Sequence, residues 1–384
     1  MNIVFLSNYF NHHQRYISDE LCVRTESYTF VTTAQMREDR KKLGYGETAI
    51  PAYVDKWSEN ESIIQDKIHQ CDAVIFGAAP YRQIRKRVYE NKLVFKYSER
   101  PLKQKKGSKD IIRYVPRWIK WHSQYPSSKS VYLLCASAYA FSDFNSFGLF
   151  GKKAYRWGYF PKANYYDIDT ILSQKKQNRI LWCGRFLDWK HPDDAICVAQ
   201  KLKSAGYSFT LDFVGIGEME SQMRELVHKL ELKDCVHFLG AMKPDEVRAQ
   251  MEQSGIFLFT SDRQEGWGAV LNEAMNSGCA VVASHAIGSV PYLVENNING
   301  LIYYSGDTEA LCNRIKYLLD NPQEQYRLGE SAYRTITEVW NAKVAAERLV
   351  NLTKHIIDGE EFPDLYQSGP CSRAEILGDD WFHE

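Results

Sequence analysis

The first 160 residues alternate short apolar runs with longer stretches in which apolar and polar positions mix. The apolar runs, rich in β-branched and aromatic residues, stand at 3–6, 28–33, 73–77, 93–97 and 131–136. Short runs with few polar positions are typical of strands buried on both faces of a parallel sheet. Because helix-like stretches separate these runs, the pattern predicts a doubly wound α/β domain.

The same pattern repeats in the second half of the chain. Strands are expected at 180–183, 210–214, 237–239, 256–260 and 280–283. Helices with the 3.6-residue period are expected at 192–205, 219–230, 244–254, 269–277, 308–320 and 323–357. Between the halves, 158–177 turns polar and has no strand pattern. The sequence therefore predicts two Rossmann-like domains, at 1–160 and 165–337.

Composition narrows the class of protein. Apolar residues make up 44% and charged residues 25% of the 384 positions, which is typical of a globular protein. No apolar run is long enough to cross a membrane, and the start MNIVFLSN lacks the basic region of a signal peptide. Nine cysteines are scattered without a C-x-x-C motif, several inside apolar runs. Buried thiols of this kind are expected in a reducing, cytoplasmic compartment.

The net charge of zero argues against a nucleic-acid-binding protein, but the charge is unevenly distributed. Residues 82–121 contain fourteen Lys or Arg and three acidic residues, a net charge of +11, together with Trp118, Ile119 and Trp121. Such a segment suits peripheral docking on an anionic membrane surface, at about 1 kcal/mol per basic residue. Alternatively it is a solvated loop. The tail, 355–384, carries −7 and could neutralise part of it by folding back.

The most informative stretch is EGWGAVLNEAM at 265–275, which follows the strand expected at 256–260 and opens a helix. Open α/β sheets bind ligands at the carboxyl ends of their strands. Gly266 and Gly268 permit close backbone approach, and the N–H groups of a new helix attract anions. Glu265 and Glu273 accept hydrogen bonds, so the group suits a polyhydroxyl ligand that carries a phosphate. The alternative is an acidic first turn favoured by the helix dipole.

The spacing of Glu265 and Glu273 resembles the E-x(7)-E pattern of retaining glycosyltransferases of the GT-B fold, the family-four group. Other segments resemble that family's motifs in the family's order: Gly184-Arg185 with Lys190, VGIGE at 214–218, FLG at 238–240, AVVA at 280–283, VPYLV at 290–294 and NGL at 299–301. Each motif alone is weak, but the ordered set from about 180 to 305 is specific.

The resemblance implies two Rossmann-like domains that face a central cleft, with 338–384 returning to the N-terminal domain. It implies a metal-independent, retaining hexosyltransferase that needs no cofactor. The donor would be a nucleotide diphosphate sugar, UDP- or GDP-linked, and the acceptor a glycan or lipid-linked glycan in surface polysaccharide or glycoconjugate synthesis. We therefore expect a cytoplasmic enzyme, with peripheral attachment to the inner face of the plasma membrane as an option.

Roles for individual residues also follow from the resemblance. Glu265 would contact the donor sugar and Glu273 the nucleotide ribose, while Arg185 and Lys190 would hold the diphosphate. Independently, two cations just past a strand end suit the charge that builds on a leaving diphosphate, although solvated surface cations would look the same. The catalytic candidates are Arg185, Lys190 and Glu265. The donor-binding candidates are Gly184, Gly215, Gly217, Gly266, Trp267, Gly268, Ala269 and Glu273.

The N-terminal domain departs from the family pattern, because the loop after its first strand has no glycine. In that loop, Asn11, His12 and His13 are candidates for the acceptor site. Adjacent helical positions point about 100° apart, so at most one histidine would face the site, and Asn11 could simply cap the helix. Further acceptor candidates follow later strands: Ser98, Glu99 and Arg100, where the family often has a histidine, and Ser137 and Tyr139. A surface ion pair is the alternative for Glu99 and Arg100.

Two motifs point elsewhere. The stretch 215–220 imitates a dinucleotide fingerprint but lacks its third glycine, which argues against a dehydrogenase. Asp167-Ile168-Asp169 imitates a metal-binding D-x-D but does not follow a strand, so no metal site is predicted. Three alternatives to a transferase stay open: an epimerase or phosphorylase of the same fold, a non-catalytic nucleotide-sugar-binding module, and a membrane-docking module.

Overall fold

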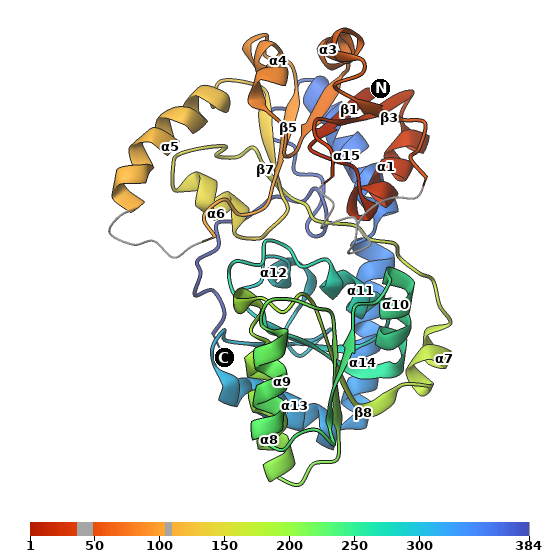
Figure 1. The fold of residues 1–384 in the computed structure, drawn as a ribbon. Helices are drawn as coiled ribbons and strands as arrows, with labels where there is room; N and C mark the ends of the chain where they lie inside the picture. The colour runs from red at the N-terminus through yellow and green to blue at the C-terminus, as the bar shows by residue number, and fades with distance from the viewer. Residues whose placement is uncertain (37–48, 104–109, 384) are drawn as a thin grey trace. The chain divides into compact units, whose positions relative to one another are not determined.

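The computed structural model describes residues 1–36, 49–103 and 110–383 (Figure 1). The chain divides into two compact units. The N-terminal unit consists of Met1–Pro161 and Asn341–Trp381, and the C-terminal unit of Lys162–Trp340 and Phe382–Glu384. Each unit is built on a parallel sheet with helices on both faces, so the predicted α/β class is confirmed.

The sheet of the N-terminal unit has seven strands in the order β3-β2-β1-β4-β5-β6-β7. Its strands are β1 (Asn2–Ser7), β2 (Ser27–Thr32), β3 (Val54–Lys56), β4 (Ala73–Phe76), β5 (Val94–Ser98), β6 (Val131–Cys135) and β7 (Ala154–Arg156). In the central strand, Phe5 pairs with Phe30 on one side and Ile75 on the other. Helices cover both faces of these strands, which explains why their sequences are continuously apolar.

The helices of the N-terminal unit form two layers. The described helices are α1 (His12–Arg24), α3 (Glu61–Gln70), the short η2 (Tyr81–Gln83), α4 (Arg85–Tyr89), α5 (Asp110–Gln124), α6 (Ala140–Asn145) and α15 (Ala342–Ile357). Side chains of α3, α4, α5 and α6 share one core with the sheet, including Ile64, Val88, Trp121 and Phe144. On the other face α1 packs beside α15, although more than 300 residues separate them (Figure 1).

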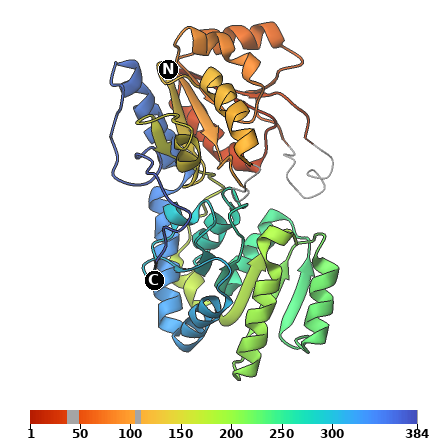
Figure 2. The same ribbon diagram turned by 90° about the vertical axis from the view of Figure 1, so that its left-hand side faces the viewer.

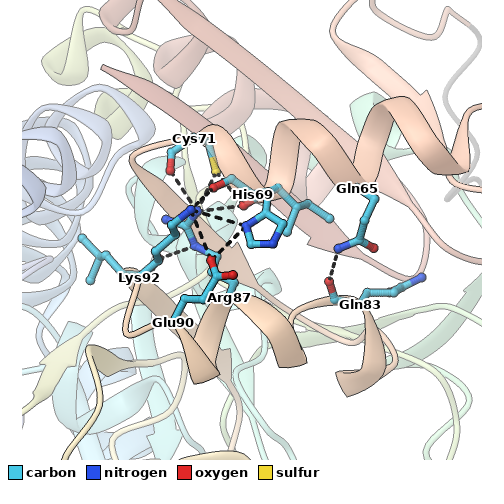
Figure 3. Close-up of polar contacts among 9 residues, drawn as sticks. Gln65, His69, Cys71, Gln83, Arg87, Glu90 and Lys92 are labelled. Atoms are coloured by element: carbon cyan, nitrogen blue, oxygen red, sulfur yellow. Dashed lines mark hydrogen bonds and ion pairs between the residues drawn. The ribbon is translucent and has the colours of Figure 1, made fainter.

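A buried arginine ties α3, α4 and β5 together (Figure 3). Arg87 on α4 is 1% exposed, and its guanidinium donates to four backbone carbonyls and, at 3.4 Å, to the Cys71 sulfur. The bonds are to the oxygens of Ile68 at 2.7 Å, Cys71 at 2.8 Å, Asp72 at 2.8 Å and Leu93 at 3.0 Å. Arg87 therefore satisfies the buried carbonyl groups around it, and its charge does not reach the protein surface.

The structure corrects the expectation of one basic surface over 82–121. Besides Arg87, two more of its cations are engaged inside the unit: Lys96 donates to the Gly77 carbonyl at 3.0 Å, and Arg100 is 3% exposed. Burial lowers the pKa of Lys96 to about 8. Lys105, Lys106 and Lys109 lie outside the described residues. The charge that reaches solvent is thus smaller and more localised than the sequence indicates.

The sheet of the C-terminal unit has six strands in the order β10-β9-β8-β11-β12-β13. Its strands are β8 (Lys176–Cys183), β9 (Thr210–Val214), β10 (Val236–Gly240), β11 (Ser254–Phe259), β12 (Ala280–Ser284) and β13 (Leu301–Tyr303). Counted within the unit this is the 3-2-1-4-5-6 order of the Rossmann fold. The strand order reverses between β8 and β11, so a ligand crevice is expected at the carboxyl ends of these two strands.

The helices of this unit also form two layers (Figure 2). They are α7 (Ile168–Ser173), α8 (Pro192–Ser204), α9 (Glu220–Lys229), α10 (Pro244–Gln253), α11 (Val270–Asn276), α12 (Val290–Leu293), α13 (Thr308–Asp320) and α14 (Pro322–Arg334). Helices α8, α9 and α13 pack on one face, where Trp182, Phe186 and Phe213 fill the core. Helix α11 packs between α10 and α14, and α14 also contacts α7.

Two details of the sequence prediction were wrong. The single helix expected at 323–357 is interrupted: α14 ends at Arg334, a π-helical turn spans Thr335–Val339, and the Asn341 side chain caps α15 by accepting from the Val344 N–H at 3.0 Å. The strand expected at 93–97 spans Val94–Ser98, so Ser98, expected after the strand, is the last residue of β5.

After α15 the acidic tail runs back across the N-terminal unit. The Tyr155 hydroxyl donates to the Pro363 carbonyl at 2.9 Å, and Tyr155 also bridges to Arg373. Further along, the Leu377 N–H donates to Ser142 at 2.6 Å, and the Trp381 indole donates to the Tyr139 hydroxyl at 2.8 Å. The tail is therefore an integral part of this unit. Within the ranges that the structure describes, no helix is sufficiently long and apolar to cross a membrane.

Candidate functional site

Loops that follow β8, β9 and β11 meet at the carboxyl edge of the C-terminal sheet. These strands are neighbours, and backbone hydrogen bonds join their loops: Gly184 N–H to Val214 O at 3.0 Å, and Phe186 N–H to Ile216 O at 3.1 Å. Gly215 has φ +129°, and a Cβ there would lie 1.9 Å from the Gly184 carbonyl oxygen. A glycine at 215 is therefore needed for the two loops to touch.

An ion pair between Lys190 and Glu265 joins the loop after β8 to the loop after β11. The Lys190 ammonium donates to a Glu265 carboxylate oxygen, and the two side chains are only 13% and 16% exposed. The loops are fixed by further bonds, from the Thr260 hydroxyl to Lys190 O at 2.6 Å and from the Ser261 hydroxyl to the same carboxylate at 3.2 Å. Two predicted catalytic residues are thus in direct contact.

The other predicted donor residues lie around this pair. Arg185 is exposed, two residues past the end of β8. Glu273 on α11 is half-buried, and burial raises the pKa of its carboxyl group. Burial, together with the charge of Glu273, raises the pKa of Cys183 to about 12, while Lys190 opposes the shift. Since Cys183 ends β8, both Glu273 and Lys190 act on the same sheet edge.

In the segment 266–268, Gly268 is required by the backbone conformation, whereas Trp267 packs in the interior of the unit. Gly268 has φ +84°, and a Cβ there would lie 2.4 Å from the Phe259 ring. The Trp267 side chain is fully buried, donates to the Asn272 side chain at 2.9 Å and packs near Trp340. The Trp267 side chain therefore packs inside the unit and is not available to a ligand. Ala269 stands at the start of α11.

Sequence reasoning missed His191, which follows Lys190. His191 adopts a left-handed conformation with φ +45°, and its Nε2 lies 3.6 Å from an Asp262 carboxylate oxygen. The hydrogen bond to Asp262 raises the pKa of the imidazole, while burial opposes this shift. The pair adds a second link between the loops after β8 and β11. A histidine beside a candidate phosphate-binding lysine was the available signal.

In the N-terminal unit, three side chains from different segments form a cluster. The ring of His13 stacks on Tyr159 with centroids 5.4 Å apart, and the Tyr159 hydroxyl donates to Glu99 at 2.7 Å. Tyr159 follows β7 and was not a sequence candidate. His13 and Glu99 were, so the structure brings two predicted residues together through a third.

Asn11, His12 and Ser98 have local structural roles. Asn11 is 4% exposed and caps α1 by accepting from the His13 N–H at 2.8 Å. Burial lowers the pKa of His12 to about 4. The Ser98 hydroxyl donates to the Glu99 carbonyl at 2.8 Å.

The structure corrects the expectation that Arg100 and Tyr139 are acceptor residues. The Arg100 guanidinium pairs with Asp143 at 3.2 Å and with Asp379 of the tail at 3.0 Å. It also lies over the Tyr139 ring, 4.5 Å from its centroid, and Tyr139 itself is 1% exposed. Both side chains contact the tail: Arg100 pairs with Asp379, and the Tyr139 hydroxyl accepts from Trp381. Ser137 is fully buried in the same region.

The two carboxylates of the D-x-D sequence, Asp167 and Asp169, bind different hydroxyl groups. Asp167 stands at the start of α7 and accepts from the Thr170 hydroxyl at 2.7 Å. Asp169 accepts from the Tyr326 hydroxyl of α14. These bonds stabilise the end of α7 and its contact with α14.

Residues 167–335, which contain the whole Lys190–Glu265 site, match the family model for glycosyl transferases group 1. This segment is a group 1 glycosyl transferase domain. The chain is 27% identical over 183 residues to the amylovoran biosynthesis glycosyltransferase AmsK of Erwinia amylovora, covering 46% of this chain and 45% of AmsK. It is 31% identical over 141 residues to the putative colanic acid biosynthesis glycosyltransferase WcaL of Escherichia coli, covering 35% and 34%. The chain thus spans under half of these curated relatives.

Solved structures extend the likeness of fold beyond the group 1 domain. HepE of Anabaena, crystallised with UDP, superposes with a TM-score of 0.64 at 16% identity, covering 93% of this chain and 99% of HepE. At this identity the likeness establishes the fold alone. The chain has the GT-B fold that the motif order implied, with two Rossmann-like units.

Proposed function

We propose that the protein is a retaining, metal-independent glycosyltransferase. It transfers a hexose from a nucleotide diphosphate sugar, UDP- or GDP-linked, to a glycan or lipid-linked acceptor in surface polysaccharide synthesis. The observation that carries the proposal is the contact of Lys190 with Glu265 at the point where the strand order of the group 1 domain reverses. AmsK, named for amylovoran biosynthesis, and HepE, crystallised with UDP-glucose, support the substrate class.

The site suits a reaction in which negative charge develops on a leaving diphosphate. The bond between the anomeric carbon and the diphosphate oxygen breaks, and an acceptor hydroxyl oxygen bonds to the same face of that carbon. The hydroxyl proton passes to the departing phosphate oxygen. Lys190 and Arg185 supply fixed positive charge for the diphosphate, where one such donor typically contributes about 10²–10³ in rate. Glu265 then accepts hydrogen bonds from sugar hydroxyls and Glu273 from the ribose.

For the acceptor we propose the cluster of His13, Tyr159 and Glu99. An imidazole, a phenol and a carboxylate together donate to and accept from sugar hydroxyls. The cluster stands near the end of β5 and at the start of α1, and the loop before α1 leaves the carboxyl end of β1. In parallel sheets such ends are the usual ligand-binding edge.

A screen of nucleotide sugars tests the proposal directly. Thermal shift is measured with UDP-, GDP- and ADP-sugars, and hydrolysis of each stabilising donor is then followed without acceptor. We expect one class of donor to raise the melting temperature and to be slowly hydrolysed with the α configuration retained. If no nucleotide sugar shifts the melt, the proposal is overturned. Epimerisation of the donor without release of nucleotide would instead identify an epimerase.

A further inference from the structure

A pocket with a volume of about 920 Å³ opens on the N-terminal unit, between η2–α4 on one side and the last residues of α5 with the chain that follows them on the other. Its lining residues are Tyr81, Arg82, Arg85, Lys86, Val88, Tyr89, Ser123, Gln124, Pro126 and Lys129. Among these described residues four are cations and none carries a carboxylate. Guanidinium, ammonium and hydroxyl groups without a competing acid are the donors that bind phosphate in proteins.

The cations of this pocket are available, unlike their neighbours in sequence. Arg87 is buried on carbonyl groups, and Lys92 pairs with Glu90 at 3.4 Å (Figure 3). By contrast, Arg82, Arg85 and Lys86 are exposed and form no ion pair with any carboxylate among the side chains that the structure describes, in 1–36, 49–103 and 114–383. The fourth cation, Lys129, is positioned by its bond to the Tyr89 carbonyl at 2.9 Å.

Helix α5, whose last residues line the pocket, has an exposed apolar face. Val115 is 59%, Trp118 44% and Ile119 57% exposed, at the spacing that places them on one side of a helix. The adjoining side is fixed to the unit, since Trp121 packs against Phe144 with ring centroids 4.9 Å apart. Within the helix, the Trp118 ring lies against His122, with centroids 4.1 Å apart. An aromatic and two aliphatic side chains held in solvent beside a basic pocket call for an apolar partner.

We propose that this pocket binds the phosphate of an anionic phospholipid headgroup while Val115, Trp118 and Ile119 enter the bilayer interface. A free phosphate would use the cations but would leave the apolar face of α5 in water. Both features are satisfied together only at an anionic membrane surface. The inference rests on the proposed function in one respect, because docking places the enzyme where a lipid-linked acceptor lies.

Vesicle co-sedimentation tests the pocket. The full-length protein is mixed with phosphatidylcholine vesicles, with or without phosphatidylglycerol. We expect binding to the anionic vesicles only, and a partition coefficient about 100-fold lower for Arg82→Ala/Arg85→Ala/Lys86→Ala. The matched control is Lys176→Ala/Lys229→Ala/Lys233→Ala, which removes the same charge from exposed positions of the C-terminal unit and keeps wild-type binding. A second variant, Trp118→Ser/Ile119→Ser, retains the cations and also binds weakly.

Equal loss in the pocket variant and its charge-matched control would overturn the proposal, as would equal binding to both kinds of vesicle. If inorganic phosphate protects Arg82 and Arg85 from chemical modification while the vesicles do not bind, the pocket takes a soluble anion and the lipid assignment is wrong. The nucleotide-sugar thermal shift of the pocket variant is measured in parallel. It is expected to equal that of the wild type, so failure of docking and failure of the transferase proposal are distinguishable.

Discussion

Lys190 and Glu265 form an ion pair at a position where neither side chain is well solvated. A bound donor must replace this contact with its own contacts to the two side chains. Their side chains are 13% and 16% exposed, so leaving either charge without a partner is costly. A bound sugar diphosphate supplies a partner for each, because its phosphate oxygens accept from the ammonium and its sugar hydroxyls donate to the carboxylate. The pair is therefore organised before the donor arrives.

Removing either member should abolish transfer while preserving the fold. For Lys190→Ala and Glu265→Ala we expect kcat to fall by about 10²–10³ or more, because each group meets charge or hydroxyls of the reacting donor. Initial rates with the donor from the screen measure this. Lys201→Ala, a solvent-exposed lysine paired with Glu309, is the matched control and should retain activity. Wild-type turnover in either site variant would refute the assignment.

His12 gives the N-terminal unit a pH dependence of its own. Burial lowers the pKa of His12 to about 4, against 6.5 when unfolded, so between these values the unfolded chain binds the extra proton. Stability is present above pH 6.5 and lost as pH falls towards 4, by about 2 kcal/mol between pH 6.5 and 5. His12→Gln should make denaturant unfolding of this unit less pH-dependent. His228→Gln on the exposed face of α9 controls for the substitution, and an unchanged slope in His12→Gln would contradict the prediction.

At the scale of elements, sequence pattern located the strands but not every break. All ten expected strands exist, and nine of them contain a run of mostly buried residues; the edge strand β10 alternates between buried and exposed positions. By contrast, β3, β7 and β13 span three residues each and are too short to form a recognisable pattern. The break before α15 depends on the Asn341 cap, which the helical period of its neighbours concealed. Motif order located Lys190 and Glu265 because both are fixed by loops local to one sheet.

The errors have a common physical origin. Arg100 looked like a loop cation because its partners, Asp143 and Asp379, lie 43 and 279 residues away. Arg87 looked like surface charge for the same reason, since its acceptors are backbone carbonyls that no residue type reveals. Tyr159 joins the candidate acceptor cluster through contacts with two residues that are distant in sequence, His13 and Glu99. Long-range burial, rather than local propensity, decided these positions.

Arg87 should be worth far more to stability than its exposed neighbours on α4. Arg87→Met leaves carbonyl groups of three segments without their buried donor, and each unsatisfied group costs about 1–3 kcal/mol. We expect the free energy of unfolding of the N-terminal unit to fall by about 3 kcal/mol or more in urea. Arg85→Met, on the same helix and exposed, should stay within about 0.5 kcal/mol. Equal effects would mean that the carbonyl contacts do not stabilise the unit.

For the whole molecule, the net charge of zero does not show whether the basic segment 82–121 and the acidic tail form ion pairs with each other. The acidic tail returns to the N-terminal unit, but of the 82–121 cations described there only Arg100 pairs with it. Two further ion pairs join the tail to the unit, Lys153 with Glu361 and Arg156 with Glu375. Both lie outside that segment and involve carboxylates that are 63% and 76% exposed. The tail therefore does not neutralise the cations of the α4–α5 pocket.

If packing rather than charge holds the tail, two variants should separate the two causes. A chain ended after Asp358 loses the contacts to Tyr155, Ser142 and Tyr139 and leaves the buried Arg100 with one carboxylate, so we expect the N-terminal unit to lose about 3 kcal/mol or more. The full-length variant Glu361→Gln/Asp364→Asn/Glu375→Gln alters only exposed charges and should lose less than about 1 kcal/mol. Hydrogen exchange of peptides from β6 and β7 reports each loss in this unit alone. Should the neutralised tail open the unit as fully as the truncation does, charge pairing would be what chiefly holds the tail in place, and the tail would release at high salt.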